Sequence, residues 1–96
     1  MSTYELRLPN DFSDYEWEVK SKGWFNGAVV TFEGELYKLS FYDPTRLSQE
    51  IKDELLSESV FFENNLLVVK TVDRSHIENA VNSLVISGKI SYLKAE

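Results

Sequence analysis

The sequence predicts one α+β domain built as a two-layer sandwich, with a mainly antiparallel sheet and two helices on one face. Three observations predict this fold class. Several stretches alternate apolar and polar residues, as strands do. Two others carry apolar residues at helical spacing, and the connections between elements are short. The 96 residues, residues 1–96, suit a single compact domain.

The first third of the chain is predicted to form extra strands on the N-terminal side of the sheet. Residues 4–8 and 15–20 both alternate apolar with charged side chains, the period of a half-buried strand. Trp24 and Phe25 then follow a turn at residues 21–23. These two aromatic residues either cap one edge of the core or form an exposed binding patch.

A β-hairpin is predicted over residues 28–42. Gly34 and Glu35 would form its two-residue loop, because glycine at the first loop position suits a type II′ turn. This loop pairs Val30 with Leu39 and separates apolar from polar side chains on the two faces of the hairpin.

A helix is predicted to begin at Asp43 and Pro44. The carboxylate can accept the free N–H groups of the first turn, and proline fits the first helical position. Leu47, Ile51 and Leu55 then recur at a spacing of four residues, so they line one face of the helix. We expect the helix to cover the sheet.

The chain after this helix is predicted to form two more strands. A short apolar run at residues 60–62 leads into a turn at residues 64–65, because asparagine tolerates the positive φ of tight turns. The strand predicted at residues 66–72 is apolar on both faces, which is typical of a central strand covered on both sides. Something besides the helices must therefore cover its second face.

A second helix is predicted from a capping-box pattern, Ser75 with Glu78, to a closing glycine at Gly88. Residues 90–93 would add a last short strand. From residue 36 onward the order is then strand, helix, strand, strand, helix, strand, which resembles the ferredoxin-like α+β sandwich. This likeness concerns the fold alone and implies no activity.

Composition narrows the classes of function. The chain has no cysteine, which excludes disulfides and thiolate sites and favours a cytoplasmic location. Its net charge of −6 disfavours nucleic acid and anionic membranes and favours a basic partner. No targeting segment or membrane span is expected. No grouping of ligands or glycines matches a metal or cofactor motif, and the lone His76 is expected to be a surface residue, so no enzymatic activity is predicted.

Two surfaces are candidate partner-binding sites. Four acidic residues form a stripe along the flank of the first helix, which is either a solvated face or a docking stripe for a basic protein: Glu50, Asp53, Glu54 and Glu58. The outer face of the second helix is almost uncharged and is a candidate contact surface: Asn79, Asn82 and Ile86.

The predicted function is a non-catalytic protein-binding module. Its most specific form is a small acidic antagonist, of the immunity type, for a basic protein such as a nuclease toxin. The alternative is a small-ligand-binding or minor enzymatic domain with a pocket under Trp17, Trp24 and Phe25. A homodimer is compatible with both hypotheses, because the strand at residues 66–72 and the neutral helix face each present surface that a second copy could cover.

Overall fold

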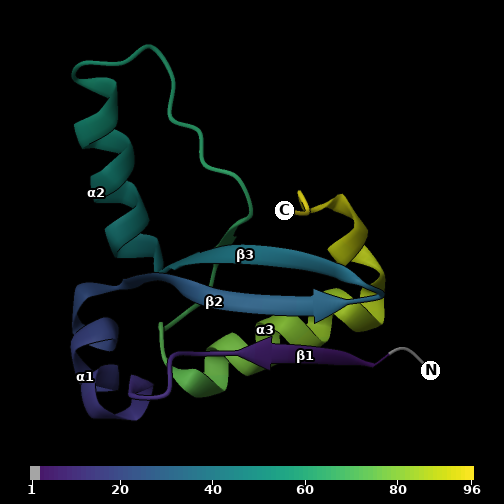
Figure 1. Ribbon diagram of the computed structural model, residues 1–96. Helices are drawn as coiled ribbons and strands as arrows, with labels where there is room; N and C mark the ends of the chain where they lie inside the picture. Colours follow the sequence, from purple (N-terminus) through teal and green to yellow (C-terminus); the bar gives the residue numbers. More distant parts are fainter. Residues whose placement is uncertain (1–2) are drawn as a thin grey trace.

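A computed structural model describes residues 3–96 and shows an α+β fold with a four-stranded mixed sheet (Figure 1). The α+β class is therefore confirmed. In chain order the elements are β1 (Tyr4–Arg7), α1 (Phe12–Lys22), β2 (Trp24–Phe32), β3 (Glu35–Tyr42), α2 (Pro44–Leu55), β4 (Leu66–Val68), α3 (Arg74–Ser87) and the 3₁₀ helix η1 (Lys89–Tyr92).

The strands lie in the order β1-β2-β3-β4. β1 pairs antiparallel with β2, and β2 with β3, whereas β4 pairs parallel with β3. The sheet is thus mixed, and β1 and β4 are its two edge strands.

The β2–β3 hairpin confirms the predicted location but corrects the loop. The loop residues are Glu33 and Gly34, and both have positive φ, 50° and 81°, as a type I′ turn requires. Val30 therefore faces Tyr37 and not Leu39. Because the register differs from the predicted one by two residues, each side chain keeps its predicted face.

The prediction of a strand at residues 15–20 is wrong, because this segment belongs to helix α1. Phe12 and Val19 lie seven residues apart and are both buried, although the helix is kinked between them at Tyr15, whose φ of −127° and ψ of 17° are not helical. Trp17 points away and is 69% exposed. The alternation of apolar and charged residues here arises within a helix whose inward face begins at Phe12. Gly23, at φ 79°, ends the helix.

The second half of the chain departs most from the prediction. Residues 60–62 form no strand, β4 is limited to Leu66–Val68, and residues 90–92 belong to the 3₁₀ helix. The ferredoxin-like element order predicted from residue 36 is therefore not formed. β4 is an edge strand rather than a central one, with Val68 49% exposed, while Val72 lies beyond it in the core.

Asn65 connects three segments near the end of the sheet. Its backbone adopts a positive φ of 55°, as expected for asparagine in a turn. The side-chain Nδ2 donates to the carbonyl oxygens of Lys38 (2.9 Å) and Lys94 (2.8 Å). Oδ1 accepts from the N–H of Lys94 (2.7 Å). This one amide fixes the C-terminal residues against β3.

Helix α3 ends at Gly88, as predicted, but its N-cap is Asp73 rather than Ser75. Asp73 Oδ1 accepts from the backbone N–H of His76 at 2.9 Å. At the other helix start, Asp43 caps α2 as predicted, accepting from the N–H of Arg46 at 2.7 Å.

The core lies between the sheet and the helices α1 and α3. Its buried residues come from α1, β2, β3, the segment just before α3, α3 itself and η1: Phe12, Val19, Phe25, Ala28, Val30, Tyr37, Leu39, Phe41, Val72, Ile77, Val81 and Ile90. Helix α2 contributes none of them and extends away from the end of β3 (Figure 1). The helices that fill the core are thus α1, where the sequence predicts a strand, and α3, as predicted, whereas the other predicted helix, α2, stays outside the core.

Candidate functional site

Four of the exposed large apolar side chains of the described residues lie at the end of helix α2 and in the loop after it. None of the residues Pro44–Leu55 is buried. Leu47 and Ile51 are half-buried, and the next apolar residues along the chain are open to solvent: Leu55 (49% exposed), Leu56 (87%), Val60 (63%) and Phe62 (78%). We call these six residues, together with the four carboxylates of the predicted stripe, the α2 surface.

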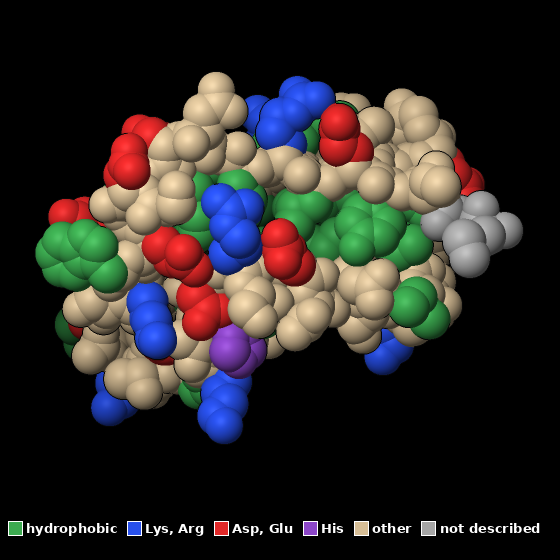
Figure 2. Space-filling view, turned by 90° about the horizontal axis from the view of Figure 1, so that it is seen from below, with side chains coloured by type: hydrophobic (Ala, Val, Ile, Leu, Met, Phe, Trp, Pro, Cys, Tyr) green, Lys and Arg blue, Asp and Glu red, His purple; other side chains and the backbone are tan. Residues whose placement is uncertain are grey.

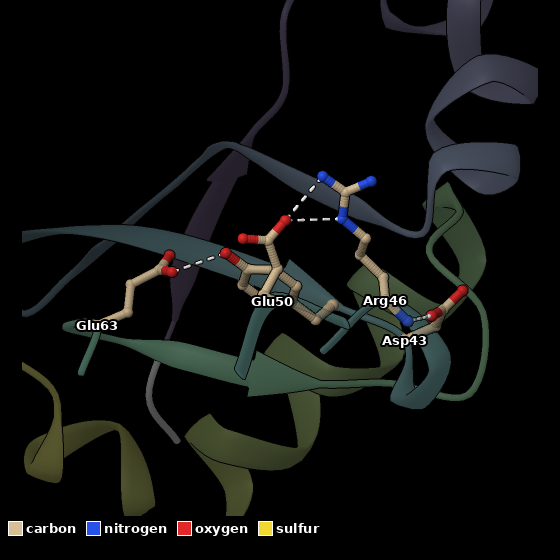
Figure 3. A network of polar contacts seen from close by, with 5 residues as sticks. Asp43, Arg46, Glu50 and Glu63 are labelled. Atoms are coloured by element: carbon tan, nitrogen blue, oxygen red, sulfur yellow. Dashed lines mark hydrogen bonds and ion pairs between the residues drawn. The ribbon is translucent and has the colours of Figure 1, made fainter. Parts of the chain in front are cut away.

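Side-chain hydrogen bonds fix the first turns of α2, whereas the later turns have none within residues 3–96. Asp43 caps the first turn and Pro44 occupies the first helical position. One turn on, Arg46 donates through Nε and Nη2 to the same oxygen of Glu50, at 2.9 Å and 2.7 Å (Figure 3). The helix is therefore anchored where it leaves β3 and free further along.

The loop that follows α2 is anchored at its far end. The hydroxyl of Tyr42, the last residue of β3, donates to Glu63 Oε1 at 2.7 Å (Figure 3). Burial, this hydrogen bond and the charges of Glu63 and Glu50 raise the pKa of Tyr42 to about 12, against a smaller lowering by Arg46. Tyr42 therefore remains a neutral donor throughout the physiological range.

The four predicted acidic residues lie on or next to α2 but differ in their surroundings. Glu50 is partly neutralised by Arg46. Asp53, Glu54 and Glu58 are exposed, and none of the ion pairs found among residues 3–96 involves them. The backbone N–H of Glu58 donates to the carbonyl of Glu54 at 2.8 Å, which continues the helical turn past Leu55. Three unpaired carboxylates are thus held beside the exposed apolar residues.

The second predicted surface is divided by the structure. Asn79 and Asn82 line a cavity of about 690 Å³ between β1 and α3, with Tyr4, Leu6 and Leu8 on the strand side. Ile86 is 77% exposed and does not line this cavity. Figure 2 shows this side of the molecule, with apolar side chains recessed between polar ones. The Tyr4 hydroxyl donates to Asn82 Oδ1 at 3.4 Å, a long contact that links the two walls.

The aromatic pocket of the alternative hypothesis is small. Phe25 is buried and packs edge-on against Phe12, with ring centroids 5.0 Å apart. Trp24 and Phe25 border a cavity of about 150 Å³ that Trp17 does not line. This volume is below the few hundred cubic ångströms of a typical small-molecule site.

His76 is tied to a structural role. Its Nδ1 lies 2.7 Å from Asp73 Oδ1, the same oxygen that caps α3. Burial alone would raise the pKa of Asp73, but the hydrogen bonds from the backbone and ring of His76, with the charges of His76 and Lys20, outweigh it and lower that pKa. Asp73 is therefore a charged cap. Among the side-chain hydrogen bonds of residues 3–96, none joins a hydroxyl group to Asp73 or His76.

The sequence identifies the apolar face at Leu47, Ile51 and Leu55 but not the exposed residues that follow it. Val60 and Phe62 lie in the run that is predicted to form a strand, and Leu56 is given no role. One signal was available: residues 56–65 contain two serines, two glutamates and two asparagines among the apolar residues, a composition closer to a loop than to a buried strand.

Residues 3–96, the part of the chain that the structure describes, contain no helix with both the length and the hydrophobicity that crossing a bilayer requires. They also contain no group of three or more histidine and carboxylate side chains placed to hold a metal ion. Comparison of the chain with protein-family models, curated proteins and solved structures finds no match.

Proposed function

We propose that this protein is a non-catalytic protein-binding module that docks onto a basic partner through the α2 surface. One observation carries the proposal: α2 has apolar residues at a spacing of four, the pattern of a helix that packs on something, yet it contributes nothing to the core. An unpartnered amphipathic helix followed by exposed Leu56, Val60 and Phe62 is typical of a surface that another protein covers.

The chemistry of the α2 surface defines the partner. An amphipathic helix binds by laying its apolar side into a hydrophobic groove, with Leu47, Ile51 and Leu55 as the spaced anchors. The unpaired carboxylate of Glu54, three residues after Ile51, borders that side, so the groove should carry lysine or arginine at its rim. The net charge of −6 would also accelerate encounter with a basic protein.

The most specific form of this function is a small acidic antagonist that neutralises a basic protein, such as a nuclease toxin, by covering it. The size of the chain and its acidity support this form. The absence of cysteine supports a reducing compartment such as the cytoplasm. A basic protein encoded beside this chain would be the first partner to test.

Two variants of the full chain test the α2 surface. The first replaces its four carboxylates: Glu50→Gln, Asp53→Asn, Glu54→Gln and Glu58→Gln. A matched control changes the same number of exposed carboxylates elsewhere: Asp14→Asn, Glu18→Gln, Glu33→Gln and Glu35→Gln. The second variant combines Leu56→Ser with Phe62→Ser. Its control combines Trp17→Ser with Ile86→Ser, which are also highly exposed but lie on α1 and α3.

Each immobilised protein is used to capture partners from a lysate, and the captured protein is then purified and titrated by calorimetry at several salt concentrations. We expect a basic protein that the wild type and both controls retain. Both α2 variants should bind it about tenfold more weakly or worse, and the carboxylate variant should lose most of its salt dependence. Capture by the wild type of no protein, or equal affinity in the α2 variants and their controls, would contradict the proposal.

A further inference from the structure

The edge strand β1 presents a backbone whose outward groups can be assigned from the register. The two-residue loop makes Phe32 and Glu35 a hydrogen-bonded pair, so the backbone groups of Phe32 point toward β3. Tyr4 lies opposite Phe32 across the β1–β2 pair. The N–H and C=O groups of Tyr4 and Leu6 therefore point away from β2, toward the open side of the sheet.

The side chains of β1 alternate between the two faces. Tyr4, Leu6 and, just beyond the strand, Leu8 are half-buried and pack against the core, and they line the 690 Å³ cavity beside α3. Glu5 and Arg7 alternate with them and are exposed, with side chains 66% and 69% accessible, although Arg7 also borders the cavity. They form an ion pair with each other, Arg7 Nη2 to Glu5 Oε1 at 2.9 Å.

We propose that two copies of the chain pair antiparallel through β1, with Leu6 facing Leu6 of the second copy across a two-fold axis. The outward groups of Leu6 are those that a hydrogen-bonded pair exchanges, so the axis passes through such a pair. Glu5 then lies opposite Arg7 of the second copy, and Tyr4 opposite Leu8. In each copy the Glu5–Arg7 ion pair within the strand is thus replaced, and the dimer has two Glu5–Arg7 ion pairs between the strands.

The charges select this register over its neighbours. Moving the axis to Glu5 places Glu5 opposite Glu5, and moving it to Arg7 places Arg7 opposite Arg7. Like charges directly opposite each other in a sheet are destabilising, whereas opposite charges contribute favourably. Registers shifted by one residue would place core-facing side chains opposite solvent-facing ones. Leu6 on the axis is thus the arrangement in which both faces of β1 match.

The β1 dimer would join two four-stranded sheets into one continuous sheet and place the cavities beside β1 next to each other. The interface is short and each copy carries a charge of −6, so its affinity should increase with salt at low ionic strength. Helix α2 leaves the sheet at β3, away from β1 (Figure 1). The β1 dimer is therefore independent of the proposed function and would leave the α2 surface of each copy open.

A charge-swap experiment on the full chain tests the register. Glu5→Arg gives two cations on the strand, and Arg7→Glu gives two anions, so each variant alone meets like charges across the axis. An equimolar mixture of the two again meets opposite charges at both positions. The control is Glu18→Arg, an exposed carboxylate on α1. Masses are measured by sedimentation equilibrium up to about 1 mM protein at 0.15 M salt, a range that detects even weak association.

We expect the wild type and the control to form a dimer of twice 11.1 kDa, each variant alone to associate at least tenfold more weakly, and the mixture to recover the wild-type affinity. A monomeric wild type over this whole range would overturn the proposal. Dimers that persist equally in both single variants would also overturn it, because another surface, or a different register, would then hold them.

Hydrogen exchange provides a second measurement that needs no variant. In the monomer the amide of Leu6 points to solvent and should exchange rapidly, whereas in the β1 dimer it is hydrogen-bonded to the second copy. Its protection should increase with protein concentration, while that of Glu5, which bonds to β2, should change little. Rapid exchange of Leu6 at concentrations where a dimer is present would contradict pairing through β1.

Discussion

At the scale of single residues, Gly23 connects two elements that are distant in sequence. It ends α1 with φ 79°, and its carbonyl accepts from the backbone N–H of Asp43 at 2.8 Å. A Cβ at this position would lie 2.5 Å from a carboxylate oxygen of Asp43, the residue that caps α2. The end of one helix and the start of another therefore depend on the absence of a side chain here.

Replacing Gly23 should cost more stability than replacing Gly88. Gly88→Ala places a Cβ in open space, so it should lose only the roughly 1 to 2 kcal/mol of a left-handed backbone. Gly23→Ala has the same φ cost, and it also displaces Asp43 from its cap, which adds about 1 kcal/mol. Urea unfolding followed by circular dichroism measures both. Equal losses would show that Asp43 moves aside without cost.

Local signals at single residues were predictable, and contacts between distant residues were not. Asp43 with Pro44 and the glycine at position 88 mark helix ends through chemistry that acts within one turn. The bridging amide of Asn65 joins residues that lie 27 and 29 positions away in the chain. Sequence patterns extend over a few residues and cannot indicate a contact across such a separation. The asparagine at position 65 therefore predicts only a turn.

At the scale of elements, α1 shows how a strand pattern can occur in a helix. A stretch with a period of two and a stretch with a period of 3.6 share many positions over six residues. Extending the window to include Phe12 separates them, because Phe12 and Val19 are both buried at an odd spacing of seven residues, which a strand would place on opposite faces. Gly23 and the lysines at positions 20 and 22 are helix-end signals in the same segment.

The start of α3 offers a test of which residue caps a helix. Asp73→Ala should destabilise the fold by about 1 to 2 kcal/mol at neutral pH, whereas Ser75→Ala, inside the first turn, should change it by less than about 0.5 kcal/mol. The pKa of Asp73 is lowered in the folded protein, so its contribution is present above 3.8 and is lost as pH falls through the lower native value.

Chemical unfolding of both variants between neutral and acidic pH makes this test. The difference between the wild type and Asp73→Ala should shrink as the pH falls below 3.8. Asp73→Asn is a useful comparison, since an amide can still cap but does not titrate in this range. A larger loss in Ser75→Ala than in Asp73→Ala would instead favour the capping box that the sequence predicts.

At the scale of the whole molecule, the sequence predicts the class of fold but not the order of the strands. The hairpin and two of the helices follow from patterns that extend over ten to fifteen residues. The parallel pairing of β4 with β3, and the partition of helices between core and periphery, depend on which apolar faces meet. An amphipathic pattern indicates that α2 has an apolar face and does not specify whether the sheet or another protein covers it.

This partition predicts that residues of the same type contribute very differently to stability. Leu39 is 1% exposed in the centre of the core, so Leu39→Ala should cost about 2 to 5 kcal/mol through lost burial and the cavity left behind. Leu55, 49% exposed on α2, has little packing to lose, and alanine favours helix, so Leu55→Ala should cost less than about 0.5 kcal/mol. Thermal or urea unfolding compares the two.

A comparable loss of stability in Leu39→Ala and Leu55→Ala would mean that α2 packs on the core, and its apolar residues would then no longer be free for a partner. A small loss in Leu55→Ala combined with weaker partner binding would assign this leucine to the interface rather than to the fold.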